Sequence, residues 1–200
     1  MNDHRLSFCI SGAGPIGLAL ALGLGQSGYQ VKLLDQKSHI DKDILVDDRR
    51  MLALSHRTVE FFKRLGVWGN MLDYATAINS VHVSQKKCKV EVLMKASQHD
   101  LDHFGYLVPQ GRVILALYEQ VLAQEHIDLC LGSKIIPSAD LSHGTVTIHQ
   151  NNEKFTETFD WLIAAEGVNS ILRNNFGIET FSRDYDQVAV FARATFEKPH

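Results

Sequence analysis

The chain has 200 residues, enough to bury one good hydrophobic core or one domain and part of another. With 22% charged residues and a formal net charge of -3, it lacks the strongly basic balance of nucleic-acid-binding proteins, and we expect no nucleic-acid partner. The three cysteines (Cys9, Cys88 and Cys130) have no metal-ligand spacing, and the ten histidines are dispersed along the chain, so we predict no metal site.

The sequence also bears on location. It has no secretory signal, and its cysteines are expected to be reduced, which together predict a cytoplasmic protein. The apolar segment after Gly17 is too short and too rich in glycine to span a bilayer.

The first predicted unit is built around a glycine turn. Its segments follow in this order: a buried strand over Leu6–Ile10, the turn Gly12-x-Gly14-x-x-Gly17, an apolar helix over Leu18–Leu24, a second strand over 30–34, and Asp35. Strand, glycine turn, helix, strand and acid is the order of a dinucleotide-binding βαβ unit.

Each residue type in this unit has a physical reason. Gly12 permits a tight turn, Gly14 lets a pyrophosphate approach the backbone, and Gly17 lets the helix pack closely on the sheet. Pro15 suits the first turn of a helix, whose N-terminal N–H groups attract phosphate. Asp35 can accept hydrogen bonds from a ribose and would repel a 2′-phosphate, which favours FAD or NAD over NADP at this turn.

The polar segment from Gln36 to Asp48 is predicted to be a surface loop. An amphipathic helix follows from Ser55 to Leu65, with Ser55 as its N-cap and Gly66 at its C-terminal end. A short helical piece is predicted over Val67–Ala75.

Strand patterns dominate the rest of the chain. The predicted elements are two antiparallel strands within 80–94, a strand over 106–108, a helix over 112–124, strands over 127–131, 135–136, 145–149, 154–159 and 161–165, a helix over 169–176, and a strand over 188–196. Asn151-Asn152 suits a hairpin turn. The fold class is therefore α/β: a Rossmann-like, doubly wound parallel sheet with an inserted antiparallel sheet at about residues 78–108.

Three further places carry candidate chemistry. Arg50, in Asp48-x-Arg50, can reach a pyrophosphate or ribityl chain, although a solvated charge cluster is the simpler interpretation. Gln110 begins a predicted helix and can contact a cofactor or only cap that helix. The segment 160–173 again leads from a buried strand through a glycine into a helix, which indicates either a second phosphate or ribose site or an ordinary turn.

Together these patterns resemble the FAD-dependent aromatic hydroxylases, the para-hydroxybenzoate hydroxylase-like flavoprotein monooxygenases. Within that group the chain is similar to the ubiquinone-biosynthesis hydroxylases of the 2-octaprenyl-6-methoxyphenol hydroxylase branch. The strings that carry the resemblance are Gly12–Leu18, Asp48–Ser55 with Leu65–Trp68, Gly105–Val108, Asp160–Arg173, and Asp186–Ala189 with Glu197–His200.

The resemblance implies a FAD-binding domain over residues 1–180 and the first part of a substrate domain over 181–200. It also implies cofactor-binding roles. The pyrophosphate would be held by Gly12, Gly14, Pro15, Ile16 and Gly17, the adenosine ribose by Asp35, the region of the flavin phosphate and ribityl chain by Arg50, and the flavin by Gln110. A second fingerprint would include Asp160, Glu166, Gly167, Ser170 and Arg173. That fingerprint is associated with both FAD and the pyridine nucleotide.

The sequence departs from the family pattern in several places. Asp35 stands where Glu is common, Glu166 where the fingerprint has Asp, and Pro109-Gln110 where the branch usually has Glu-Asn. Nothing matches the third family fingerprint, a Gly-Asp pair. We therefore expect an N-terminal part of a longer enzyme that lacks hydroxylase activity by itself.

The implied reaction is hydroxylation of the aromatic ring of a prenylated phenol through a flavin C4a-hydroperoxide, with NAD(P)H as electron donor. The implied partners are this substrate and a protein complex of ubiquinone biosynthesis, with peripheral contact at the inner membrane. No catalytic residue is assigned, because a surface position is the simpler interpretation of His39, His56 and His103.

Two other functions stay open at this point. An NAD-dependent dehydrogenase needs only the first βαβ unit, although the antiparallel insertion and the second fingerprint argue against it. A truncated, non-catalytic nucleotide-binding module is the other alternative.

Overall fold

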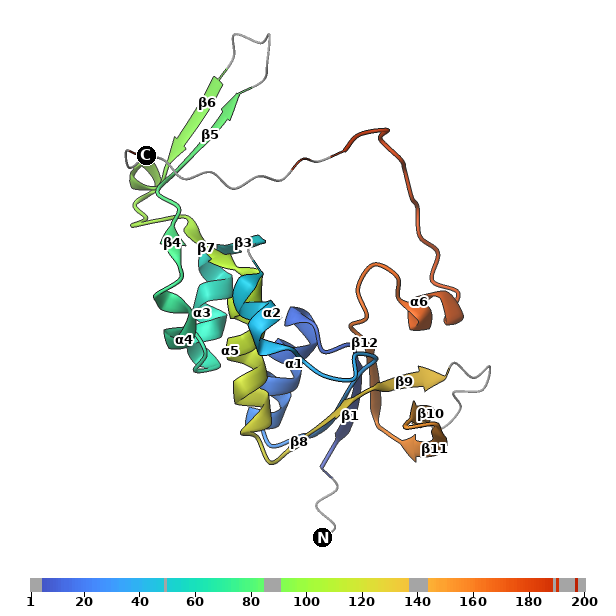
Figure 1. Ribbon diagram of the computed structural model, residues 1–200. Helices are drawn as coiled ribbons and strands as arrows, with labels where there is room; N and C mark the ends of the chain where they lie inside the picture. Colours follow the sequence, from blue (N-terminus) through green and yellow to red (C-terminus); the bar gives the residue numbers. More distant parts are fainter. Residues whose placement is uncertain are drawn as a thin grey trace.

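The computed structural model describes residues 5–48, 50–84, 91–136, 144–188, 190 and 197. At its centre is a four-stranded parallel sheet in the order β12-β1-β2-β8 (Figure 1). Its strands are β1 (Ser7–Ser11), β2 (Gln30–Asp35), β8 (Ile127–Leu131) and β12 (Trp161–Ala164). Because β2 and β12 lie on opposite sides of β1, the strand order reverses there, and such reversals form ligand crevices in parallel α/β sheets.

Helices cover one face of this sheet. The helices of the described chain are α1 (Pro15–Gln26), α2 (Lys42–Asp47), α3 (His56–Arg64), α4 (Gly69–Leu72), α5 (Gln110–Leu122) and α6 (Ile171–Asn175), with a 3-10 turn, η1 (Ala96–His99). Ile10 and Leu33 of the sheet share a fully buried cluster with Leu22 of α1 and Leu117 of α5. This cluster is the larger of the two cores and places the N-terminus of α1 at the carboxyl end of β1.

A second sheet covers the opposite face. Strands β9 (Ser133–Ile136), β10 (Thr145–Gln150) and β11 (Glu153–Thr158) form an antiparallel layer in the order β11-β10-β9. Cys9 and Leu34, whose side chains lie on the face opposite Ile10 and Leu33, share a core with Ile135 and Ile148 of this layer. The predicted Rossmann-like parallel sheet is therefore confirmed, with an antiparallel sheet on its second face.

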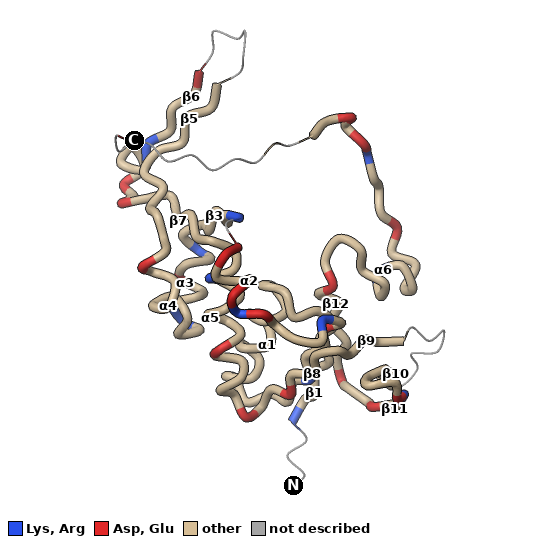
Figure 2. The backbone as a smooth tube through the Cα atoms, viewed as in Figure 1, with Lys and Arg blue, Asp and Glu red and all other residues tan. Residues whose placement is uncertain are grey.

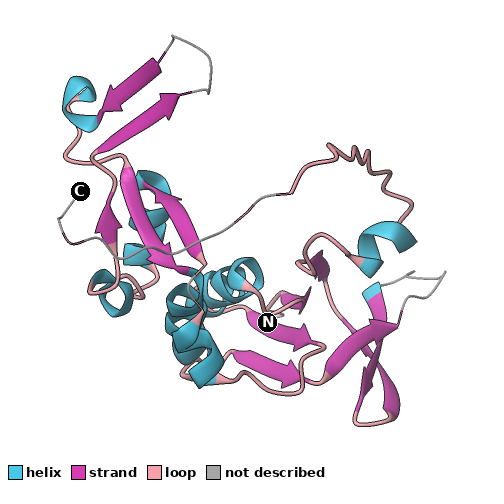
Figure 3. Ribbon diagram, turned by 45° about the horizontal axis from the view of Figure 1, so that its top comes forward, coloured by secondary structure: helices cyan, strands magenta, loops and turns pink. Residues whose placement is uncertain are grey.

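The antiparallel insertion is confirmed as well. Strand β7 (Gly105–Pro109) pairs with β3 (Met51–Ser55) and β4 (Thr76–Ala77), and β5 (Ser80–Ser84) pairs with β6 (Glu91–Lys95). The β5–β6 hairpin projects from the body of the protein (Figures 1 and 3). The division at residue 180 into two domains stays a prediction.

Local signals explain several boundaries. The side chain of Ser55 accepts a hydrogen bond from the Thr58 N–H, which confirms it as the N-cap of α3. Gly66 ends that helix at a positive φ of 74°. Asn151 and Asn152 both have positive φ, as a tight hairpin turn between β10 and β11 requires.

Three predictions need correction. The segment 36–48 is not all loop, because the Asp41 carboxylate caps α2 by accepting from the Asp43 and Ile44 N–H groups. Strand β3 was not predicted, since its burial depends on pairing with the distant β7. The strand beginning at Trp161 is not buried throughout, because β12 is a sheet edge and Trp161 is 58% exposed. Of the strand predicted over 188–196, residues 189 and 191–196 lie outside the described residues, as does Cys88.

Candidate functional site: a groove at the strand reversal

The turn from β1 into α1 is fixed by close backbone contacts. Gly12 has a φ of +109°, and a Cβ there would overlap the Ala165 carbonyl at the end of β12. A Cβ at Gly17 would overlap the carbonyl oxygen of Gly12. These two glycines therefore shape the turn and set its distance from β12, as the sequence pattern predicts.

Gly14 differs because the space beside it is open. It is the N-cap of α1 with ordinary extended angles, and nothing lies within 4 Å of where its Cβ would be. The helix has no side-chain cap and no acidic residue in its first turn. The N–H groups of Ile16 and Gly17, in the first turn, therefore have no intrahelical acceptor, an arrangement that favours a bound anion. Ile16 is 76% exposed at this rim.

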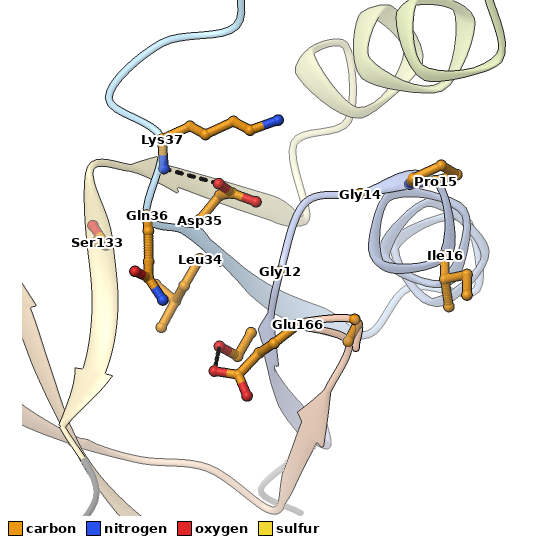
Figure 4. A pocket seen from close by; sticks show the side chains of 13 residues that line it. Gly12, Gly14, Pro15, Ile16, Leu34, Asp35, Gln36, Lys37, Ser133 and Glu166 are labelled. Carbon is orange, nitrogen blue, oxygen red and sulfur yellow. Dashed lines mark hydrogen bonds between the residues drawn. The ribbon is translucent and has the colours of Figure 1, made fainter. Parts of the chain in front are cut away.

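Asp35 ties the end of β2 to the glycine turn. Its carboxylate accepts a hydrogen bond from the Ala13 N–H at 2.7 Å and another from the Lys37 N–H at 2.9 Å. Each carboxylate oxygen can accept a second hydrogen bond, so Asp35 still has capacity for ribose hydroxyls. The acid thus holds the turn in place and faces the space in front of it (Figure 4).

Three adjoining cavities open around this turn. The Glu166 cavity has a volume of about 430 Å³ and is lined by residues that include Ser11, Gly12, Gly14, Asp35, Glu166 and Gly167. The Ile40 cavity, of about 390 Å³, includes Gly14, Asp35, Lys37, Ile40, Ile44 and Ile114. The Arg50 cavity, of about 740 Å³, includes Gly14, Pro15, Lys37, Asp48, Arg50 and Gln110.

Gly14 and Lys37 line all three cavities, so the cavities form one groove. It runs from the end of β12, past the N-terminus of α1, to the start of α5. This is where ligands bind in parallel α/β sheets, outside the carboxyl ends of the strands and at the reversal of strand order. Of the predicted site residues, nine line it, and Gly17, Asp160, Ser170 and Arg173 do not.

At the second predicted site, at the end of β12, the polar side chains are bonded within the protein. Glu166 accepts hydrogen bonds from the Ser11 hydroxyl at 3.0 Å, the Ser170 hydroxyl at 2.6 Å and the Leu172 N–H at 3.0 Å. Ser170 is buried and caps α6 by accepting from the Arg173 N–H. Arg173 donates to the Val168 carbonyl. Of this segment, Glu166 and Gly167 line the groove, while Ser170 and Arg173 are not among its lining residues.

At the other end of the groove, Arg50 is paired with Asp48. The guanidinium contacts both carboxylate oxygens, with Nη2 at 2.7 Å from Oδ2 and Nε at 2.9 Å from Oδ1. This side-chain hydrogen bonding lowers the pKa of Asp48 and raises the pKa of Arg50. Acidic residues gather on α2 beside this pair (Figure 2). A ligand phosphate would therefore have to share Arg50 with Asp48.

Gln110 lies beside Arg50 for a structural reason. The Gln110 N–H, at the start of α5, donates to the Arg50 carbonyl at 2.7 Å, which joins β3 to the helix. Pairing of β3 with β7 thus brings residues 60 positions apart to one wall of the groove.

Sequence reasoning missed part of the lining. Lys37 lies on all three cavities, and its position two residues after the acid was the available signal. Ser133, Ile40 and Ile114 also face the groove, but nothing local in the sequence marks them.

A parallel sheet, a glycine turn and an elongated groove at the strand reversal define a dinucleotide-binding α/β domain. A sequence match to the FAD binding domain family covers residues 5–199, so the chain belongs to this family, one of FAD-dependent monooxygenases.

Named relatives agree with this assignment at low identity. The mitochondrial ubiquinone biosynthesis monooxygenase COQ6 of Caenorhabditis elegans is 25% identical over 94% of this chain and 44% of its own length. The ubiquinone hydroxylase UbiM of Neisseria meningitidis is 26% identical over 92% of this chain and 41% of its own length. The chain thus spans less than half the length of these relatives.

Solved structures show the same fold. The anhydrotetracycline hydroxylase OxyS of Streptomyces rimosus superposes with a TM-score of 0.73 at 23% identity, covering 90% of this chain and 35% of the other. Among the residues that the structure describes, no helix is long and apolar enough to cross a membrane.

Proposed function

We propose that this chain binds FAD in the groove and forms the cofactor-binding part of a monooxygenase that hydroxylates the aromatic ring of a prenylated phenol in ubiquinone biosynthesis. The observation that carries the proposal is the continuity of the groove. Glycine turn, acid, Arg50 and Gln110 all line one elongated space, as an extended dinucleotide requires. The names of COQ6 and UbiM support the substrate class.

The groove residues fit the parts of FAD. The open space at Gly14 and the free N–H groups of α1 would take the pyrophosphate. Asp35 would accept from the adenosine ribose, and the Lys37 ammonium would offset phosphate charge. Arg50 and Gln110 would lie toward the ribityl chain and flavin. Bound FAD supplies the redox and oxygen chemistry, while these residues bind it and orient it.

The end of β12 would act as a support. Glu166 joins β1 to the start of α6, so it would hold the wall of the groove in place. Gly167, with a positive φ of 81°, would let the backbone turn beside the ligand. We propose a positioning role for Ser170 and Arg173, since the Ser170 hydroxyl caps α6 and one guanidinium nitrogen of Arg173 donates to the Val168 carbonyl.

The first experiment is a visible absorption spectrum of the purified chain, with the released cofactor identified by chromatography. We expect the two flavin bands and FAD, or, for a colourless preparation, saturable quenching of added FAD fluorescence. Asp35→Asn should weaken FAD binding, whereas Asp73→Asn, beyond the end of α4, serves as the matched control. Binding of NAD and not FAD would contradict the proposal and support a dehydrogenase.

Hydroxylation is proposed for the whole protein, with NAD(P)H as donor. We also propose that the 200-residue chain alone is inactive, that its surroundings are cytoplasmic, and that contact with the inner membrane and with other ubiquinone-biosynthesis proteins is peripheral. The test is incubation of the longer protein with NADPH, oxygen and a short-chain prenylphenol, followed by mass spectrometry. The expected product carries one added oxygen. An unchanged phenol with an FAD-loaded protein would refute the substrate assignment and leave the FAD assignment intact.

A further inference from the structure

Basic side chains form a row across the outer face of the antiparallel sheet. Lys134 of β9 lies directly opposite His149 of β10, and His149 lies directly opposite Lys154 of β11. Residues in register on neighbouring strands place their side chains on the same face. We call Lys134, His149 and Lys154 the basic row. It lies on the far side of the parallel sheet from α1 and α5 (Figure 1).

The row is not neutralised by the protein around it. Within the described residues, none of its three side chains makes a hydrogen bond or an ion pair. On the same face, the positions two residues along the strands are Ile136, Thr147 and Thr156, all uncharged.

The acidic residues of β11 do not relieve this charge. Strand alternation places Glu153 and Glu157 on the inner face, where Glu157 pairs with Lys32 of the parallel sheet. Basic groups set side by side across strands lower sheet stability, so strand pairing gives no reason for the row.

A cavity lies at the row. Its volume is about 310 Å³, and it is lined by all three residues of the row together with Ile135, Ile136 and Ile171 of α6. Neighbouring strands are about 4.8 Å apart, so the two lysines start about 10 Å apart with the imidazole between them. Two flexible ammonium groups can therefore converge on one small ligand, and the isoleucine wall strengthens their attraction for it.

We propose that this cavity binds a phosphate-bearing anion, separately from the FAD groove. The two ammonium groups and the imidazole N–H that line the cavity are all donors for phosphate oxygens. The small volume fits a diphosphate or a phosphate monoester headgroup. The ligand is either a free phosphate compound or the headgroup of an anionic lipid, and both share this chemistry.

The test is a titration of the ¹⁵N-labelled chain with inorganic pyrophosphate, followed by amide chemical shifts. We expect saturable shifts at Lys134, His149 and Lys154 in addition to any at the glycine turn. The double variant Lys134→Gln/Lys154→Gln should bind at this site about 25-fold more weakly, about fivefold for each lysine removed. The variant Lys134→Arg/Lys154→Arg keeps both positive charges and should bind as the wild type does. If the Gln variant folds poorly, this variant still tests whether the charges at the row bind the ligand.

A matched control removes the same charge elsewhere. Lys63→Gln/Lys95→Gln, on α3 and β6, should leave the shifts at the row unchanged. An equal loss in this control, or shifts confined to the groove, would overturn the proposal. So would a Gln variant that aggregates but binds as before, since the lysines would then only protect the edge strands.

A second arm identifies the source of the phosphate. The chain is sedimented with phosphatidylglycerol vesicles and with phosphatidylcholine vesicles. Co-sedimentation with the anionic vesicles, lost in the Gln variant, assigns a lipid headgroup. Pyrophosphate binding without vesicle binding assigns a free phosphate compound. Binding in neither arm would overturn the proposal.

Discussion

The two strand-to-helix turns at the reversal of the sheet begin alike and end differently. Each follows a parallel strand, passes through a glycine and enters a helix N-terminus. The β1–α1 turn is shaped by backbone contacts and leaves open space at Gly14. The β12–α6 turn also leaves open space, at Gly167, but its polar side chains are engaged within the protein: Glu166 accepts from Ser11, Ser170 and Leu172, and Ser170 caps α6. A similar sequence signal thus yields a binding surface in one turn and a support in the other.

The largest expected effect is at Gly17. Gly17→Ala should destabilise the protein by about 3 kcal/mol or more, because its Cβ would overlap the Gly12 carbonyl, which is backbone and cannot move aside cheaply. Urea unfolding measures the change. The control is Gly23→Ala on the same helix, where the nearest atom is a Leu65 methyl at 3.7 Å and a gain of up to about 1 kcal/mol is expected. Equal effects at the two positions would refute the tight turn.

Glu166 tests the supporting role of the other turn. Glu166→Gln should cost about 2 kcal/mol, because one side-chain oxygen cannot replace a carboxylate that accepts three hydrogen bonds. Unfolding free energy and FAD affinity should be measured together, and stability should change more than affinity. A larger loss of affinity than of stability would instead make Glu166 a direct ligand of the cofactor.

At Gly14 we expect the reverse of Glu166, with FAD affinity changing more than stability. Gly14→Ala should change stability by less than about 0.5 kcal/mol, because its angles are ordinary and its side is open. FAD affinity should fall about tenfold or more, a loss of about 1.4 kcal/mol, since the methyl group would occupy the approach to the backbone. Gly69→Ala, also with open space but outside the groove, should leave affinity unchanged. An unaltered affinity in Gly14→Ala would place the pyrophosphate elsewhere.

The strands that lead into the two turns differ in burial: Cys9 of β1 is fully buried, whereas Trp161 of β12 is 58% exposed. The burial of β1 should make the stability of the protein depend on pH through Cys9. Burial raises the pKa of the Cys9 thiol in β1 to about 12, with a further contribution from Glu157. A raised folded pKa means that this stability is complete below the unfolded value of 9.0 and is lost as pH rises toward 12. By pH 10 the loss from Cys9 should be about 1.4 kcal/mol. Denaturant unfolding at pH 8 and pH 10 should show a smaller fall in Cys9→Ala than in the wild type. Equal falls would mean that Cys9 ionises freely in the fold.

A charged contact joins the parallel sheet to the antiparallel layer that covers its second face. Lys32 of β2 pairs with Asp128 of β8 at 3.3 Å and with Glu157 of β11. Desolvation by burial acts to lower the pKa of Lys32, but the hydrogen bonds and charges of Glu157 and Asp128 outweigh it and the pKa is raised. This contact ties the antiparallel layer, and with it the basic row, to the parallel sheet.

Local sequence signals were enough for the βαβ unit and for several caps. Gly12, Gly14 and Gly17 stand between a strand pattern and a helix pattern, and Asp35 follows the second strand at once, so the signals agree in order and spacing. Ser55, Gly66 and the Asn151-Asn152 turn act through neighbours a few residues away, so their effects can be read from sequence. The family followed from the order of these signals along the chain.

Other features depended on distant contacts. Strand β3 exists because it pairs with β7, and that pairing brings Arg50 to Gln110. Glu166 is a support because β12 lies beside β1, where Ser11 can reach it.

The sequence by itself determined the dinucleotide-binding class and the residues of the glycine turn, because glycine geometry and helix capping are local. Only the tertiary structure decided that the three cavities join into one groove, that Lys37 lies at its centre, and that a row of basic residues crosses the second sheet. Those depend on strand order and register, which join residues far apart in the chain.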